Sequence, residues 1–164
     1  MVALILVACI PYIRGLTGAF VWDDRTYFLD NDVLPRLKPW DISSILLRPS
    51  NAWGEHLPLR DFLFVLQYNL FGQNPLGYHI VSLCLYFAVG LILYRFTGLL
   101  YRQFREGTGR ALSGFAGATL PALFVSVFFL LHPVHVEAVS YISGQKDLLF
   151  SFFTFSALFM FLKY

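Results

Sequence analysis

The chain of 164 residues is 57% hydrophobic and 18% aromatic but only 13% charged, and its mean hydropathy is +0.63. A soluble domain carries about 25% charged residues, so the charged side chains here are too few to cover a water-facing surface. The same numbers exclude a disordered chain, because disorder requires low hydrophobicity and high net charge. The net charge of +2 provides no basic field for nucleic acid. We therefore expect an all-α integral membrane protein that binds no nucleic acid.

Four apolar segments are candidates for membrane-spanning helices, since the hydrocarbon core of a bilayer requires about 20 mostly apolar residues. They cover approximately residues 1–13, 77–101, 112–131 and 148–164. Arg95 lies near the end of the second segment, where its long side chain can reach the interface. The fourth segment is still apolar where the sequence stops. We therefore expect a single membrane domain, 1–164, that is the N-terminal fragment of a longer protein.

The charges between these segments predict the orientation of the chain. The loop of residues 102–111 carries three arginines and one glutamate, so the positive-inside rule places it in the cytoplasm. Lys163 returns to the cytoplasmic side in agreement. The outer loops, residues 14–76 and 132–147, then face the opposite side of the membrane, and the N-terminus is cytoplasmic.

The first outer loop opens with two adjacent carboxylates, Asp23 and Asp24. Two like charges this close resist joint ionisation, so the pKa of one should rise unless a cation or a metal intervenes. Such a pair suits a general base or a ligand set for a hard divalent cation. The alternative is structural: the two aspartates cap the following helix or pair with Arg25.

An aromatic-rich stretch closes the first outer loop and predicts a second feature, a helix lying along the membrane surface. Its larger apolar side chains fall roughly on one helical face, namely Phe62, Leu63, Leu66, Leu70 and Phe71. About twelve residues are too few to cross a bilayer, which favours an interfacial helix. Ordinary packing against the helical bundle is the alternative. Residues 72–77 are typical of a turn before the next span.

The second outer loop gathers ionisable side chains next to a span. His132, His135 and Glu137 have residue types that bind metals, although their spacing matches no standard zinc motif. The alternative is that they are polar residues at the interface, with Lys146 paired to Asp147. Ionisable groups at a membrane boundary are candidates for a functional site in either case.

Four motifs, taken in order, resemble one known family. They are Phe20-Val-Trp-Asp-Asp, Tyr68-Asn-Leu-Phe-Gly-Gln-Asn-Pro-Leu-Gly-Tyr-His, His132-Pro-Val-His-Val-Glu-Ala-Val and Gly144-Gln-Lys-Asp-Leu-Leu. The chain resembles, over nearly its whole length, the N-terminal part of the tetratricopeptide-repeat O-mannosyltransferase-like membrane proteins and their bacterial relatives.

The resemblance implies a multi-span helical bundle of the GT-C glycosyltransferase type. Members of the family transfer, or are thought to transfer, a hexose such as mannose from a polyprenyl phosphate to an acceptor outside the cytoplasm. The implied partners are a lipid-linked sugar donor, a protein or glycan acceptor, and a membrane, either a bacterial inner membrane or the endoplasmic reticulum. No cofactor is assigned, and a divalent metal ion stays open.

The resemblance also assigns site residues. In this fold the first outer loop carries the acidic catalytic residue, so that role falls on Asp23 or Asp24, with a slight preference for Asp24. The second outer loop would line the same cavity through His132, His135, Glu137, Lys146 and Asp147. Transfer from a lipid phosphate requires a carboxylate to deprotonate the acceptor and cations to hold the leaving phosphate.

Arg60 and Lys146 are the candidate phosphate contacts, and arginine is better suited to bidentate binding of phosphate. Family members commonly carry Tyr-Arg-Pro-Leu where this chain has His56-Leu-Pro-Leu, so Arg60 is the candidate replacement for the missing arginine. The later spans and the repeat domain of the family lie outside this sequence, and we do not expect the four-span piece to catalyse alone. The alternative is a non-catalytic assembly subunit or a degenerate family member.

Overall fold

The structure is a computed structural model that describes residues 4, 6, 9–48, 54–107 and 116–164. Within these residues all regular secondary structure is helical, which confirms the expectation of an all-α protein. The helices are η1 (Ile10–Thr17), α2 (Asp23–Phe28), η2 (Leu34–Arg36), α3 (Ile42–Leu47), α4 (Pro58–Phe71), α5 (Pro75–Gly107), α6 (Ala116–Leu131), η3 (Pro133–His135), α7 (Val136–Ser140), η4 (Ile142–Gly144) and α8 (Gln145–Lys163).

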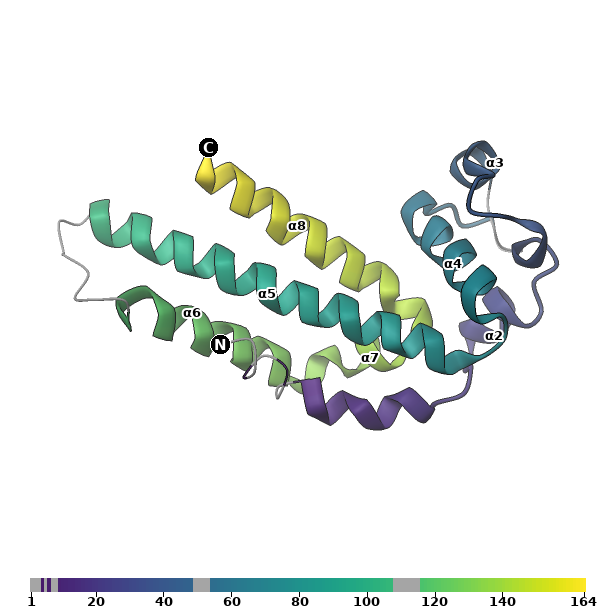
Figure 1. Ribbon diagram of the computed structural model, residues 1–164, viewed down its shortest axis with the longest axis horizontal. Coiled ribbons are helices and arrows are strands. Elements are labelled where there is room, and N and C mark those ends of the chain that lie inside the picture. The colour runs from purple at the N-terminus through teal and green to yellow at the C-terminus, as the bar shows by residue number, and fades with distance from the viewer. Residues whose placement is uncertain (1–3, 5, 7–8, 49–53, 108–115) are drawn as a thin grey trace.

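The long helix α5 forms the axis of the molecule (Figure 1). α6 and α8 run along it and pack against it, and η1 lies against both α5 and α7. The short helices α2, α3 and α4 gather around the N-terminal end of α5. The first outer loop is therefore a compact helical unit at one end of a three-helix layer.

Two helical segments, Pro75–Gly107 and Ile142–Lys163, are long and apolar enough to cross a membrane. α6 passes the same test only together with the short helices that follow it, and that pair is bent by 52°. The bend has a simple cause, because Pro133 has no N–H to continue the hydrogen bonds of α6. The described residues thus contain two candidate spans, or three if the bent pair is one span.

Some of the expected segments are described only in part. Of residues 1–13, the expected first span, positions 1–3, 5, 7 and 8 lie outside the described residues, and the part from Ile10 onward belongs to η1. The first residues of the expected third span, 112–115, and part of the predicted cytoplasmic loop, 108–111, also lie outside them. α5 itself continues to Gly107, beyond the expected end of the second span.

Local signals explain where α5 begins. Pro75 occupies the first turn, where its fixed φ suits a helix and its missing N–H costs nothing. The side chain of Asn74 accepts a hydrogen bond from the backbone N–H of Leu76 at 3.1 Å. Gly72, with φ +58°, allows the tight turn out of α4, and the hydroxyl of Tyr78 donates to the Gly72 carbonyl at 2.7 Å. This turn fixes the angle between α4 and α5.

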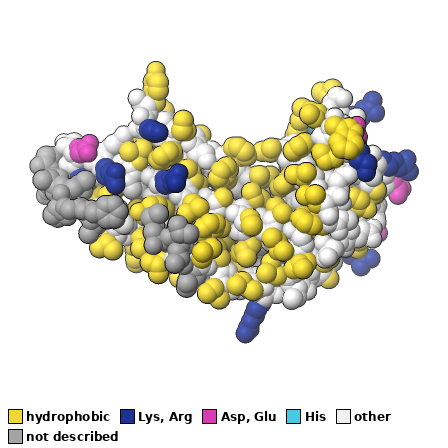
Figure 2. Space-filling view, viewed as in Figure 1, with side chains coloured by type: hydrophobic (Ala, Val, Ile, Leu, Met, Phe, Trp, Pro, Cys, Tyr) yellow, Lys and Arg dark blue, Asp and Glu magenta, His cyan; other side chains and the backbone are white. Residues whose placement is uncertain are grey.

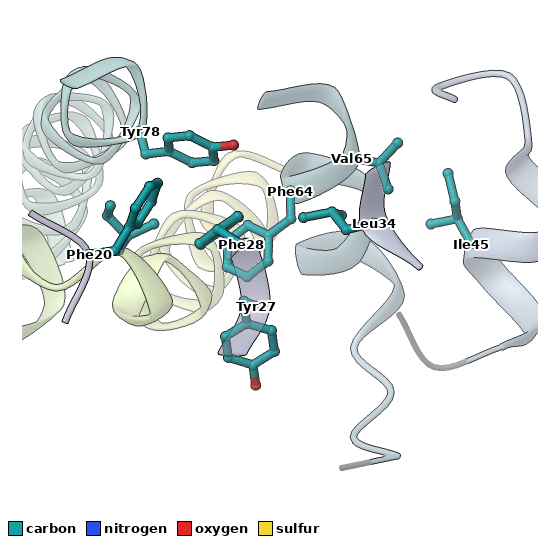
Figure 3. Close-up of a cluster of buried hydrophobic side chains, with 9 residues drawn as sticks. Phe20, Tyr27, Phe28, Leu34, Ile45, Phe64, Val65 and Tyr78 are labelled. Carbon is teal, nitrogen blue, oxygen red and sulfur yellow. The ribbon is translucent and has the colours of Figure 1, made fainter. Parts of the chain in front are cut away.

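A cluster of aromatic side chains holds the outer-loop unit against the end of α5 (Figure 3). The ring of Phe28 is central, with its centroid 4.8 Å from that of Phe64 and 4.6 Å from that of Tyr78. The buried members of the cluster are Phe20, Tyr27, Phe28, Leu34, Ile45, Phe64, Val65, Tyr78 and Ile142. Because they come from the chain before α2 and from α2, η2, α3, α4, α5 and η4, one core joins both outer loops.

The predicted surface helix exists as α4, and its two faces differ. The face toward the core buries Phe64 and Val65. The expected apolar face is the less buried one, and Leu70 on it is 66% exposed. Both faces of α4 are therefore apolar. One face packs in the core, as the alternative expects, and an interfacial location for the other face stays a prediction.

The surface of the molecule is divided by charge (Figure 2). Hydrophobic side chains cover most of its middle, and the charged side chains gather mainly toward the two ends. A band of apolar surface between two charged ends is the distribution expected of a protein that sits across a bilayer.

Candidate functional site

The carboxylate of Asp24 is buried at the first turn of α2 and joins the two outer loops. Its Oδ1 accepts hydrogen bonds from the backbone N–H of Ser143 at 2.8 Å and from the Ser143 hydroxyl at 2.6 Å. Its Oδ2 accepts a longer one, 3.4 Å, from the backbone N–H of Val21. Burial raises the pKa of Asp24, and the hydrogen bonds from Ser143 and Val21 oppose that rise. The expected rise in pKa thus falls on Asp24, with burial as its main cause.

Asp23 has a different environment, because its side chain is exposed. Its backbone N–H donates to the hydroxyl of Tyr141 at 3.2 Å, so the second outer loop also holds this residue in place. Among the described residues the ion pairs involve Arg60 and Lys146 and not Arg25. The pair of aspartates is therefore split into one buried carboxylate, Asp24, and one exposed carboxylate, Asp23, which interacts with the Tyr141 hydroxyl.

Trp22, next to this pair, has an unusual backbone. Its φ of +46° is a strained value for a bulky residue, and its side chain is 83% exposed. The indole packs edge-on to Tyr141 at 6.3 Å between centroids. The two rings line an open cleft of about 380 Å³ together with Glu137. The exposed indole of Trp22, the half-buried ring of Tyr141 and the exposed carboxylate of Glu137 form a surface on which an acceptor could rest.

A second polar group lies at the start of α4. The buried guanidinium of Arg60 donates from Nε and Nη2 to Oδ1 of Asp61, at 2.9 and 2.7 Å, and from Nη1 to Oε2 of Glu55 at 2.5 Å. The Tyr27 hydroxyl donates to the same Glu55 oxygen at 2.6 Å. These hydrogen bonds, that from Tyr27 first, lower the pKa of Glu55. Glu55 is therefore a carboxylate held in its charged form.

Lys146 joins this polar group from α8. Its Nζ lies 3.9 Å from Oε1 of Glu55, so Lys146 pairs with Glu55 and not with Asp147, which is exposed. Arg60 and Lys146 both line a groove of about 560 Å³ between the start of α4 and α8. The walls of the groove are mainly apolar and include Leu149, Phe150, Phe153 and Ala157. An apolar groove with two cations near its end suits an anionic lipid.

The remaining predicted residues do not share this groove. His132 accepts a hydrogen bond at Nδ1 from the backbone N–H of Val134, at 3.2 Å. The ring of His135 packs on Phe129, with 4.1 Å between centroids. Glu137 lines the cleft beside Trp22. Within the described part of the chain, no group of three or more His, Cys, Asp or Glu side chains is arranged to hold a metal ion.

The segment from Ser143 to Lys146 makes several buried contacts with distant helices that its sequence does not indicate. A Cβ on Gly144 would lie 3.0 Å from Cα of Ala138, so only glycine fits without a shift. The side chain of Gln145 is fully buried. Its Oε1 accepts a hydrogen bond from Nε2 of Gln67 in α4 at 2.8 Å, and its Nε2 donates one to the Ser82 hydroxyl of α5 at 3.0 Å. Sequence analysis missed Ser143 and Gln145, because their partners Asp24, Gln67 and Ser82 are distant in the chain. It also missed Glu55, which pairs with the nearby Arg60 and the distant Lys146.

Comparison with known proteins gives relatives of one kind. The chain is 29% identical over 99% of its length to the protein named Protein O-mannosyl-transferase F38B6.6 of Caenorhabditis elegans. It is 31% identical over 90% of its length to Protein O-mannosyl-transferase Tmtc3 of Drosophila melanogaster, and 29% identical over 90% to human Protein O-mannosyl-transferase TMTC4. These homologues confirm the resemblance that the four motifs indicate.

The chain spans 23%, 17% and 20% of the length of these three relatives. No family model matches it. No solved structure matches it either.

The contacts of Asp24 predict that the two obvious replacements differ in their effect on stability. Asp24→Ala leaves the N–H and the hydroxyl of Ser143 buried without their acceptor, so we expect a loss of about 1–3 kcal/mol in the free energy of unfolding. Asp24→Asn keeps an acceptor oxygen and removes a charge that burial disfavours, so the loss should be smaller. Thermal unfolding of both variants in detergent measures the difference. Equal losses would contradict the assigned contacts, and Asp32→Asn, at an exposed aspartate, is the control.

Proposed function

We propose that the protein is the N-terminal membrane portion of a glycosyltransferase, which transfers a mannose-like hexose from a polyprenyl-phosphate-linked donor to an acceptor on the non-cytoplasmic side. One observation carries the proposal. The segment from Ser143 to Lys146 holds the acidic start of α2 at one end and supplies a cation to an apolar groove at the other. A carboxylate for the acceptor and a groove for a lipid phosphate are thus attached to the same short segment. The homologues, which are named protein O-mannosyl-transferases, support transfer of mannose.

In this proposal Asp23 is the general base. A base must reach the hydroxyl whose proton it removes, and of the two aspartates Asp23 is the exposed one. Asp24, the residue that sequence analysis slightly preferred, is buried with both oxygens accepting hydrogen bonds. We assign it a positioning role, in which its bond to Ser143 fixes the backbone that presents Asp23. The cleft beside Trp22 and Glu137 would receive the acceptor, a protein or a glycan.

The groove between α4 and α8 would hold the donor. Its apolar walls would take the polyprenyl chain, and Lys146 with Arg60 would face the phosphate. Arg60 is already paired with two carboxylates, whereas the one ion pair of Lys146 among the described residues is the 3.9 Å contact with Glu55. Lys146 is therefore the cation that is freer to bind a new anion, and the phosphate would compete with Glu55 for it.

The wider architecture belongs to the same proposal. It includes a GT-C type of bundle, four spans, a cytoplasmic N-terminus, outer loops facing away from the cytoplasm, and residence in a bacterial inner membrane or the endoplasmic reticulum. His132, His135 and Asp147 keep their proposed place near the substrates through the second outer loop.

The assigned base predicts a loss of transfer without a loss of stability. In the complete protein, Asp23→Asn should lower the rate of hexose transfer by about 10²–10⁴-fold, the usual contribution of a general base. Its thermal unfolding should match that of the wild type, because the Asp23 side chain is exposed. Transfer of radiolabelled mannose from dolichyl phosphate mannose measures the rate, with Asp32→Asn as the matched control. A wild-type rate in Asp23→Asn would reject the mechanism and favour the non-catalytic alternative.

The polar end of the groove predicts two effects of opposite sign on binding of an isoprenoid phosphate. Lys146→Gln should weaken binding of farnesyl phosphate, because it removes a cation. Glu55→Gln should strengthen it, because it removes a competing anion and keeps the hydrogen bonds to Arg60 and Tyr27. Calorimetric titration in detergent measures both affinities, and farnesol, which has no phosphate, should bind all forms alike. Lys38→Gln is the control. Changes of the same sign in both variants would contradict the assignment of the groove.

A further inference from the structure

A second pocket, remote from the aspartates, lies where α5, α6 and α8 come together at the opposite end of α5. Its volume is about 290 Å³. Three of its lining residues are cations, Arg95, Arg102 and Lys163, and none of its described lining residues is acidic. Figure 2 shows Lys and Arg side chains gathered at this end of the molecule.

The spacing of the chain brings these cations together. Arg95 and Arg102 are seven residues apart on α5, which is two helical turns, or about 10 Å along one face. Lys163 comes from the last turn of α8. That turn is held to α5 by a hydrogen bond of 2.6 Å from the side-chain amide of Gln103 to the carbonyl of Leu162. Gly98 lies between the two arginines and leaves space, since a Cβ there would meet only Ala122, at 3.7 Å.

No described side chain forms an ion pair with the cations of this pocket. Among the described residues, the ion pairs are those of Arg60 and Lys146, so none includes Arg95, Arg102 or Lys163. Three like charges around one small space repel one another. An anion that enters the space would relieve the repulsion, and arginine side chains are well suited to the oxygens of a phosphate.

The position of the pocket along α5, at the end of its apolar part, indicates the source of that anion. α5 carries no Asp, Glu, Lys or Arg between its start at Pro75 and Arg95, so Arg95 marks the end of the apolar part of the helix. The other lining residues include Tyr94, Leu99 and Phe159, which are suited to contact acyl chains. Cations above an apolar wall, at the end of two candidate spans, match the boundary between lipid tails and headgroups.

We propose that this pocket binds the phosphate group of an anionic phospholipid at the membrane boundary. Phosphate is the shared chemistry, and it can come from a lipid headgroup or from free phosphate. The apolar wall favours the lipid. This site is independent of the proposed glycosyl transfer and stands whether or not the chain takes part in catalysis.

The test compares lipids and variants in the full-length protein. Native mass spectrometry in detergent measures the affinities for dioleoyl phosphatidylglycerol, which is anionic, and dioleoyl phosphatidylcholine, which is not. We expect the triple variant Arg95→Gln, Arg102→Gln, Lys163→Gln to lose about tenfold or more of the preference for phosphatidylglycerol, since each cation near the surface contributes to attraction of anionic lipid. The control removes the same charge elsewhere, with Arg36→Gln, Lys38→Gln and Arg48→Gln, and should keep the preference.

A separate titration with inorganic phosphate identifies the source of the ligand. Tight binding of inorganic phosphate that the triple variant abolishes would assign the site to a soluble phosphate, and weak binding together with a lipid preference would assign it to a phospholipid. An unchanged preference in the triple variant, or an equal loss in the control variant, would overturn the proposal. Thermal unfolding of both triple variants confirms that they are folded.

Discussion

The buried contact between Asp24 and Ser143 is the interaction on which the rest of the site depends. Two segments separated by 119 residues meet there, through two hydrogen bonds to one carboxylate oxygen. Burial of a carboxylate is costly unless such bonds compensate it, and here they come from a backbone N–H and a hydroxyl that need an acceptor of their own. The contact fixes α2 against the chain before α8. It thereby also sets the position of the adjacent, exposed Asp23.

The residues after Ser143 extend this constraint through the molecule. Gln145 bonds side chains of α4 and α5, and Lys146 reaches the carboxylate of Glu55 at the mouth of the apolar groove. The buried charge of Arg60 is compensated by Asp61 and Glu55. The groove therefore has a polar end without an unpaired buried charge. Among the described residues, no carboxylate pairs with the cations of the pocket at the far end of α5. We therefore propose that an external anion binds there.

The sequence predicts much of this fold because apolar length and charge are local properties. The helical class, a long apolar helix over residues 77–101 and the helix of residues 62–71 follow from composition and spacing alone, although α5 continues to Gly107. The sequence does not show that Asp24 is buried while its neighbour is exposed, because that depends on Ser143, which is distant in the chain. The same holds for Lys146, whose partner proved to be Glu55 and not the adjacent Asp147. The unit formed by the first outer loop was also missed, since its core is built from rings of four separate segments.

The most direct test of the account is a double-mutant cycle between Asp24 and Ser143. The free energy of unfolding in detergent is measured for Asp24→Ala, for Ser143→Ala and for the double variant. Residues in direct contact show a coupling of about 0.5–3 kcal/mol, so the two losses should not add. A parallel cycle with Asp32→Ala in place of Asp24→Ala should be additive. Additive losses for Asp24 and Ser143 as well would contradict the contact that orders the two outer loops.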